Sequence, residues 1–169
     1  MTHTRCLSLR SVSLFAAILA VVPAHVGSAQ PAPMTHHPHT AVAKGTFVVK
    51  LAPLAFEGQA EGTTLGRMSI DKQIAGDLVA TTAGQMLSAM TSTKGSAGYV
   101  AIERVEGTLH GRAGTFVLLH TGLMHRGTPT LSVTVVPDSA TGELVGLSGT
   151  FEIIIADGTH SYEFRYSLP

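Results

Sequence analysis

The residues best suited to chemistry are polar side chains that alternate with apolar ones along runs of strand-like sequence. Six of them share a strand face with apolar neighbours: Lys72, Tyr99, Glu103, His120, His160 and Tyr162. Residues at every second position of a strand lie on the same face. If these faces line the interior of a β-barrel, the six side chains converge in a mostly apolar space with room for one small ligand. Burial there would shift their pKa values, and a Glu–His pair could move a proton.

The same alternation also arises in proteins without such a site. The six residues can be core or rim polar groups that bond to other parts of the protein. They can also lie on the solvent-facing side, because alternation alone does not say which face is buried. In the barrel interior each one needs a partner, since an unpaired buried polar group costs roughly 1–3 kcal/mol. The six residues are therefore candidate ligand-binding residues, and no catalytic residue is assigned.

The elements that would position these side chains are short β-strands. Strands are expected over Lys44–Ala52, Leu65–Gln73, Gly76–Thr82, Gln85–Thr93, Gly98–Leu109, Thr115–Met124, Thr130–Val136, Thr150–Ala156 and Thr159–Leu168. The third and fourth are separated by a hinge at Ala83-Gly84, and Asp157-Gly158 fits a two-residue type I′ hairpin turn. This pattern predicts an all-β fold, either a sandwich or an antiparallel closed β-barrel of about eight strands. The barrel is favoured, because closure removes exposed strand edges.

The N-terminal segment has the features of a signal peptide. Arg5 and Arg10 precede the apolar run Val12–Val22, which is too short to span a bilayer comfortably, and Gly27-Ser28-Ala29 supplies small residues for cleavage. We expect a signal peptide over residues 1–29, a disordered linker over 30–43 and a single barrel domain over 44–169. The protein is then exported from a bacterial cell, to the periplasm or outside. The alternative is an uncleaved N-terminal anchor.

Composition excludes several classes of function for the cleaved chain. Cleavage removes Arg5 and Arg10 from the 11 basic residues and nothing from the 11 acidic ones, so nine against eleven leaves a net charge of −2. Nucleic-acid binding has no electrostatic support. No second apolar run reaches spanning length, so no membrane partner is expected after cleavage. The single cysteine, Cys6, leaves with the signal peptide, so the mature chain forms no disulfide.

No cofactor or metal is expected. The sequence His36-His37-Pro38-His39 carries imidazoles of the kind that bind Zn, Cu or Ni, but a solvated tail is favoured because nothing nearby would orient them. The glycines of Gly142–Gly149 resemble a phosphate-binding loop only in number, because the Lys-Ser/Thr pair is missing.

The outer surface of the predicted barrel is partly apolar. Both faces of Phe116–Leu119 and of Ile153–Ile155 carry apolar side chains. A strand that faces water on one side usually alternates cleanly between apolar and polar residues. Either a covering loop or a partner subunit hides the outer face, so a homo-oligomer is expected as one of the two alternatives.

Five stretches, in order, carry a resemblance to a known family: Gly45–Phe47, Leu65–Gln73, Gly95–Gly111, Ser132–Gly149 and His160–Tyr162. Together they resemble a bacterial domain family of unknown function whose members look like the allene oxide cyclase barrel. The resemblance covers about residues 44–168 and implies a barrel of that kind. It implies no catalytic residue, because the family has no assigned activity and one fold hosts many functions.

Three functions remain open on these grounds. The first is an exported barrel that binds a small apolar or amphipathic ligand in its interior. The second is an enzyme of cyclase or isomerase type, in which an interior Glu or His is the acid–base group. The third is a structural or assembly module with a solid barrel. An interior filled by large apolar side chains favours the third, and convergent ionisable groups favour the second.

Overall fold

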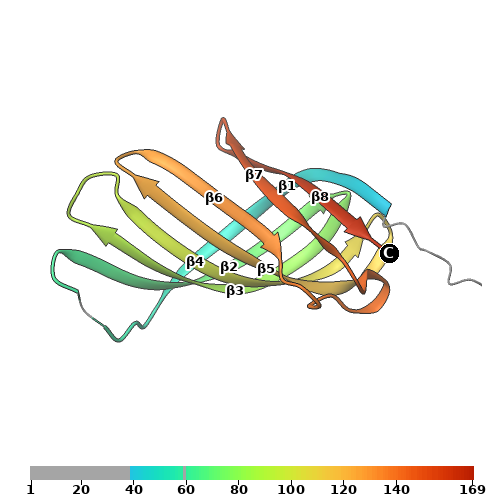
Figure 1. The fold of residues 1–169 in the computed structure, drawn as a ribbon, viewed down its shortest axis with the longest axis horizontal. Coiled ribbons are helices and arrows are strands. Elements are labelled where there is room, and N and C mark those ends of the chain that lie inside the picture. Colours follow the sequence, from blue (N-terminus) through green and yellow to red (C-terminus); the bar gives the residue numbers. More distant parts are fainter. Residues whose placement is uncertain (1–38, 59) are drawn as a thin grey trace, which may run out of the picture. The chain divides into compact units, whose positions relative to one another are not determined.

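Eight antiparallel strands follow one another around a closed barrel, and the last pairs with the first (Figure 1). The computed structural model describes residues 39–58 and 60–169. The strands are β1 (His39–Leu54), β2 (Thr63–Gly76), β3 (Leu78–Thr91), β4 (Ala97–Leu109), β5 (Arg112–His125), β6 (Thr128–Val135), β7 (Ser148–Ala156) and β8 (Thr159–Leu168). The described residues contain no α-helix, only the 3-10 turn η1 (Gly142–Leu144). The antiparallel closed barrel expected from the sequence is therefore confirmed.

None of the described residues forms a helix long and apolar enough to cross a membrane.

Tight two-residue turns set the register of the hairpins. Asp157 and Gly158 both have positive φ, 50° and 76°, as a type I′ turn requires. The same combination occurs at His110-Gly111, where φ is 47° and 82°. β5 begins at Arg112, three residues before the expected start at Thr115, so this turn contains only His110 and Gly111.

Two of the differences from the expected strand bounds bear on the site and on the domain limits. The segments Gly76–Thr82 and Gln85–Thr93 form one continuous strand, β3, because Gly84 permits a close approach to β4 and makes no turn. The strand β1 begins at His39, so strand pairing extends into the part expected to be a linker. The signal peptide, residues 30–38 of the linker and most of the histidine-rich segment lie outside the described residues.

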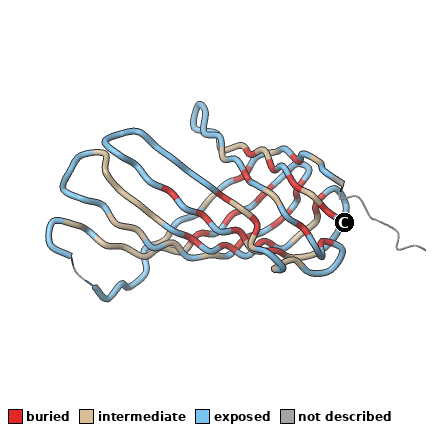
Figure 2. Tube along the Cα trace, viewed as in Figure 1, coloured by how far each residue is buried: buried red, intermediate tan, exposed pale blue. Residues whose placement is uncertain are grey.

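One end of the barrel is a solid apolar core (Figure 2). The connection between β6 and β7 contributes Leu144 and Leu147, both buried, to this end. Inside, the Phe164 ring lies 5.7 Å from the rings of Phe116 and Phe151, measured between centroids. We call this part the packed half. Its interior is filled by protein side chains, as close-packed protein cores are.

The inner face of the other half remains accessible to solvent. Strands β1 to β5 have 13–16 residues, whereas β6, β7 and β8 have 8–10. In addition, β6 and β7 share only the pair Thr134–Thr150 and then diverge (Figure 1). Inward-facing positions of β1 to β6 in this half are therefore half-buried or exposed: Leu51, Met68, Met86, Tyr99, Met124 and Leu131. We call this part the exposed half.

The outer face of β4 and β5 is partly apolar, as the sequence indicated. Val100, Ile102 and Leu119 are exposed there, while Val117 is half-buried. The backbone of Val117 bonds to the β6–β7 connection, since its carbonyl accepts from the Val136 N–H at 2.9 Å. An intramolecular cover therefore accounts for part of the apolar outer face. The homo-oligomer remains a prediction for the rest.

Candidate functional site

Four neighbouring strands bring one buried polar cluster together where the packed half meets the exposed half. Its members are Lys72 from β2, Thr82 from β3, Glu103 from β4 and His120 from β5. They are the buried polar and charged residues of the described chain. All four point inward, so Lys72, Glu103 and His120 lie on the face expected for them.

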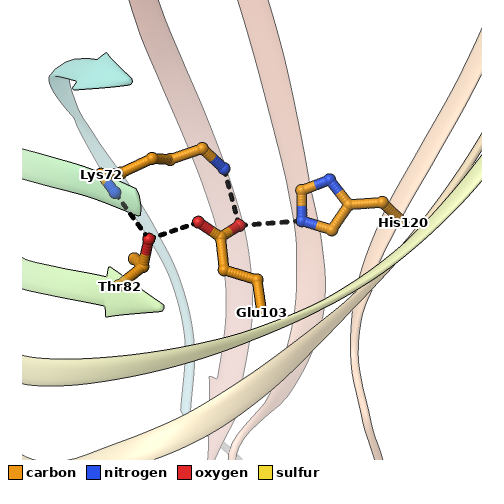
Figure 3. A network of polar contacts seen from close by, with 4 residues as sticks. All are labelled: Lys72, Thr82, Glu103 and His120. Carbon is orange, nitrogen blue, oxygen red and sulfur yellow. Dashed lines mark hydrogen bonds and ion pairs between the residues drawn. The ribbon is translucent and has the colours of Figure 1, made fainter. Parts of the chain in front are cut away.

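The carboxylate of Glu103 is the centre of the cluster (Figure 3). Its Oε1 accepts a hydrogen bond from the Thr82 hydroxyl at 2.5 Å, and its Oε2 accepts one from Lys72 Nζ at 2.6 Å. The Thr82 hydroxyl in turn accepts from the Lys72 backbone N–H at 2.9 Å. Glu103 is completely buried, so both of its oxygens depend on these protein donors.

His120 approaches the same carboxylate without a well-formed hydrogen bond. Its Nε2 lies 3.0 Å from Oε2 of Glu103, close enough for an electrostatic contact. Nε2 makes no hydrogen bond of good geometry with the described residues, so this ion-pair contact is its one polar contact there. The ring is 2% exposed. A buried nitrogen without a well-formed hydrogen bond is unusual and needs a specific reason.

The surroundings keep Glu103 ionised. Burial by itself would raise the pKa of this carboxyl. The contact with His120, the charge and hydrogen bond of Lys72 and the Thr82 hydroxyl outweigh burial and lower the pKa to about 2. Glu103 is therefore a carboxylate at neutral pH and a poor proton carrier. In this cluster the proton-carrying role is open to His120.

A glycine makes room for the cluster. Gly84 is the inward-facing partner of Glu103 across β3 and β4. A Cβ added at Gly84 would lie 2.5 Å from the Ile102 carbonyl oxygen and 2.9 Å from Cα of Glu103. Any larger residue would push β4 away from β3. Lys72 therefore reaches Glu103 across β3 because position 84 has no side chain.

Tyr99 lies between the cluster and the exposed half. Its ring covers Gly122, the next inward position after His120, and a Cβ at Gly122 would collide with that ring. Burial raises the pKa of Tyr99, and the charge of Glu103 raises it further. Tyr99 is thus close to the cluster and only half-buried. It is the first side chain that a molecule on the exposed inner face would meet.

His160 reaches the cluster only indirectly. Its ring centroid lies 5.2 Å from that of Phe47, and the Phe47 ring lies 5.2 Å from Lys72 Nζ. The Phe47 ring thus separates the imidazole from the ammonium and contributes a cation–π contact.

Tyr162 has a structural role instead. Its hydroxyl accepts a hydrogen bond from the Leu78 N–H at 2.9 Å and lies 3.4 Å from the Leu78 carbonyl. Its ring stacks on Phe151 with centroids 4.9 Å apart. Burial raises the pKa of this phenol. Of the six candidates, Lys72, Glu103 and His120 meet directly, Tyr99 lies beside them, and His160 and Tyr162 do not join them.

The sequence did not lead us to expect Thr82 and Gly84 at the site. The expected hinge at Ala83-Gly84 hid the alternation of Ala80, Thr82 and Gly84 along one face. That alternation was the available signal for Thr82. Nothing local distinguishes the close approach at Gly84 from a turn.

A separate hollow lies on the outer side of the barrel. It has a volume of about 760 Å³ and is lined by Phe56 from the β1–β2 connection and by Leu87, Val100 and Ile102 from β3 and β4. Its lining includes no cluster residue. Its polar lining residues are Glu57, Arg67 and Gln85, and Arg67 bonds to Gln85 at 2.6 Å. This hollow has the apolar character of a ligand site but no buried polar group.

The cluster offers a ligand more donors than acceptors. Both oxygens of Glu103 are occupied, whereas Lys72 has three N–H groups and gives one of them to Glu103. Among the described residues, no group of three His, Cys, Asp or Glu side chains could hold a metal ion. The arrangement can therefore bind an acceptor group and hold an imidazole in a fixed orientation.

Comparison with known proteins identifies the family. Residues 43–166 match a family described as "Protein of unknown function (DUF3224)". The crystal structure, at 1.84 Å resolution, of a protein with unknown function from the DUF3224 family of Shewanella oneidensis MR-1 is similar, with 49% sequence identity and a TM-score of 0.75. The similarity covers 78% of this chain and 98% of that chain. No curated protein matches. The resemblance to a bacterial family of unknown function is confirmed, and the chain belongs to the DUF3224 family.

Proposed function

We propose that this protein is an exported carrier or receptor for a small amphipathic molecule. The apolar part of that molecule lies on the inner face of the exposed half, and its polar end reaches the Lys72–Glu103–His120 cluster. The observation that carries the proposal is the buried Nε2 of His120, which makes no well-formed hydrogen bond with the described residues and lies where this apolar inner face begins.

The inner face has the composition of a ligand site. Leu51, Met124 and Leu131 are 47%, 42% and 46% exposed although they face inward. Ligand sites combine mostly apolar surface with a few well-placed polar groups. Methionines, which Met68 and Met86 also contribute, adapt their shape to different ligands. The apolar part of a ligand would cover side chains that water now contacts.

Stability alone does not require the buried charges. Replacing a buried ion pair by apolar side chains of similar volume is often neutral or stabilising. A solid barrel would therefore be served at least as well by apolar residues at Lys72 and Glu103, as in the packed half. The cluster thus argues for binding rather than for a purely structural module.

The proposal is tested with an apolar dye and paired variants. N-phenyl-1-naphthylamine, a neutral dye that fluoresces in apolar surroundings, is titrated into the purified protein. Leu131→Glu puts a charge on the inner face, and Thr130→Glu puts the same charge on the outer face one residue earlier. Both positions are exposed, so both variants should fold. We expect Leu131→Glu to weaken dye binding at least tenfold and Thr130→Glu to change it less than twofold.

A third variant separates the inner face from the outer hollow. Leu87 lines the hollow under Phe56 and faces outward. If Leu87→Glu abolishes dye binding while Leu131→Glu does not, the ligand occupies the outer hollow and the proposal is wrong. The neutral 1-alkanols provide a further check, because each buried methylene contributes about 0.8 kcal/mol, or about a fourfold gain in affinity.

A second candidate function is proton transfer by His120. The observation that favours it is the Glu103 carboxylate 3.0 Å from the ring, since a fixed carboxylate orients an imidazole and stabilises its protonated form. The low pKa of Glu103 makes His120 the acid–base group of such an enzyme. Incubation of a bound ligand in deuterated water would test this. An enzyme of this kind should exchange a carbon-bound hydrogen of the ligand for deuterium, and His120→Gln should abolish the exchange.

A further inference from the structure

We infer that the ligand's polar end is a singly charged anion, a carboxylate, bound beside Glu103 by the Lys72 ammonium and the His120 ring. This inference rests on the proposed function and adds the chemical class of the ligand to it: an amphipathic carboxylic acid.

The hydrogen-bonding groups of the cluster point to an acceptor. The Phe47 ring and Glu103 are the groups near the Lys72 ammonium, and Glu103 takes one N–H, so at least one N–H has no oxygen acceptor among the described residues. His120 Nε2 also makes no well-formed hydrogen bond with the described residues, although Oε2 of Glu103 lies 3.0 Å away. Both oxygens of Glu103 are already bonded. A ligand that supplied donors would have to displace an existing bond, whereas acceptor oxygens would complete the cluster.

The charge of the cluster limits the charge of the ligand. The ammonium of Lys72 and the carboxylate of Glu103 cancel, and His120 adds one positive charge only when its ring is protonated. The cluster therefore neutralises at most one negative charge. Uncompensated charge is expensive to bury, so a dianion such as a phosphate monoester is disfavoured.

The geometry fits a head with two oxygens. Lys72 Nζ and His120 Nε2 both lie within 3.0 Å of the same atom, Glu103 Oε2, so the two donors are at most 5.6 Å apart. Figure 3 shows them approaching this oxygen from different sides. A carboxylate has one oxygen for each donor. Its chain would then pass Gly122, which the Tyr99 ring covers, and reach Leu131 on the exposed inner face.

The test compares four ligands with one ten-carbon chain and different heads. Decanoate, 1-decanol, decyl phosphate and decyltrimethylammonium are titrated calorimetrically into the purified full-length protein below their micellar concentrations, near pH 7.5. We expect decanoate to bind at least tenfold tighter than 1-decanol and than decyl phosphate, and the trimethylammonium compound to bind most weakly.

Two variants assign the preference to the cluster. The double change Lys72→Met with Glu103→Gln removes the ammonium without leaving a buried carboxylate unpaired. It should bind decanoate and 1-decanol within threefold of each other. Lys94→Met, which removes an exposed lysine between β3 and β4, should retain the tenfold preference.

A spectroscopic measurement on wild-type protein tests the inference even if the double variant does not fold. In wild-type protein with ¹⁵N-labelled histidine, decanoate should shift the Nε2 resonance of His120 and 1-decanol should shift it far less. Equal shifts would overturn the inference.

The outcomes separate the inference from the proposed function. If none of the four ligands binds, the proposed function fails. If decanoate and 1-decanol bind equally, the proposed function stands but the inference is wrong, because the cluster then does not recognise a carboxylate. If decyl phosphate binds more tightly than decanoate, the ligand's polar end is not a monoanion. If the preference for decanoate over 1-decanol survives the double change, the carboxylate binds somewhere other than the cluster.

Discussion

The charge of Glu103 should make the stability of the protein depend on pH in a specific window. In the folded protein the contact with His120, Lys72 and Thr82 lower the pKa of this carboxyl from 4.5 to about 2, against the opposing effect of burial. At 1.36 kcal/mol per pKa unit, this difference corresponds to about 3 kcal/mol. A lowered folded-state pKa means that the carboxylate stabilises the fold fully above pH 4.5. That contribution is lost as the pH falls to about 2.

Glu103→Gln removes the titrating group but keeps its shape. At pH 7 it leaves the buried Lys72 ammonium without a counter-ion, and breaking a buried pair costs about 3–5 kcal/mol. At pH 2 the wild-type carboxyl is itself largely protonated. The difference in unfolding free energy between wild type and variant should therefore be about 3 kcal/mol at pH 7 and shrink as the pH falls below 4.5. Urea denaturation at pH 7, 5, 4, 3 and 2 measures it.

A neighbouring glutamate provides the matched control. Glu106 lies on the same strand, points outward and pairs with Arg104 at 2.6 Å, with both side chains exposed. Exposed pairs contribute about 0–1 kcal/mol. Glu106→Gln should therefore leave stability nearly unchanged at every pH. If the Glu103→Gln difference were constant from pH 7 to pH 2, or no larger than that of Glu106→Gln, the buried carboxylate would not have the stabilising role assigned to it.

Four further outcomes are expected. Tyr162→Phe leaves the buried N–H of Leu78 without its partner and should lower the unfolding free energy by about 1–3 kcal/mol in urea denaturation; no change would mean that the hydroxyl contact is dispensable. Gly84→Ala should cost about 1–3 kcal/mol in the same assay, because β4 must shift to make room, and a neutral result would contradict the close approach. If the homo-oligomer forms through the apolar outer face, Ile102→Asp should lower the mass found by light scattering, whereas a monomeric wild type at micromolar concentration ends that idea. If the protein is exported, N-terminal sequencing of material from its native cell should begin near Gln30, and an intact Met1 would show that it is not.

Local patterns in the chain were enough to predict the strands and the face on which the main candidates lie. Glu103 and His120 alternate with apolar residues, and the structure places both inside the barrel because only that face can be buried throughout. The Asp157-Gly158 turn followed from two residues that tolerate positive φ. These features depend on the local backbone and on side-chain periodicity, which the amino-acid order displays directly.

Which candidates meet became visible only in the folded barrel. Lys72 lies 31 residues before Glu103, and they touch because the empty position at Gly84 lets a side chain cross β3. Tyr162 was expected at the same site, yet its hydroxyl bonds to the Leu78 backbone, 84 residues away in the chain. Distances across a barrel depend on the register and curvature of several strands together. No local pattern encodes them, so the sequence predicted the inward residues and the fold selected those that form the cluster.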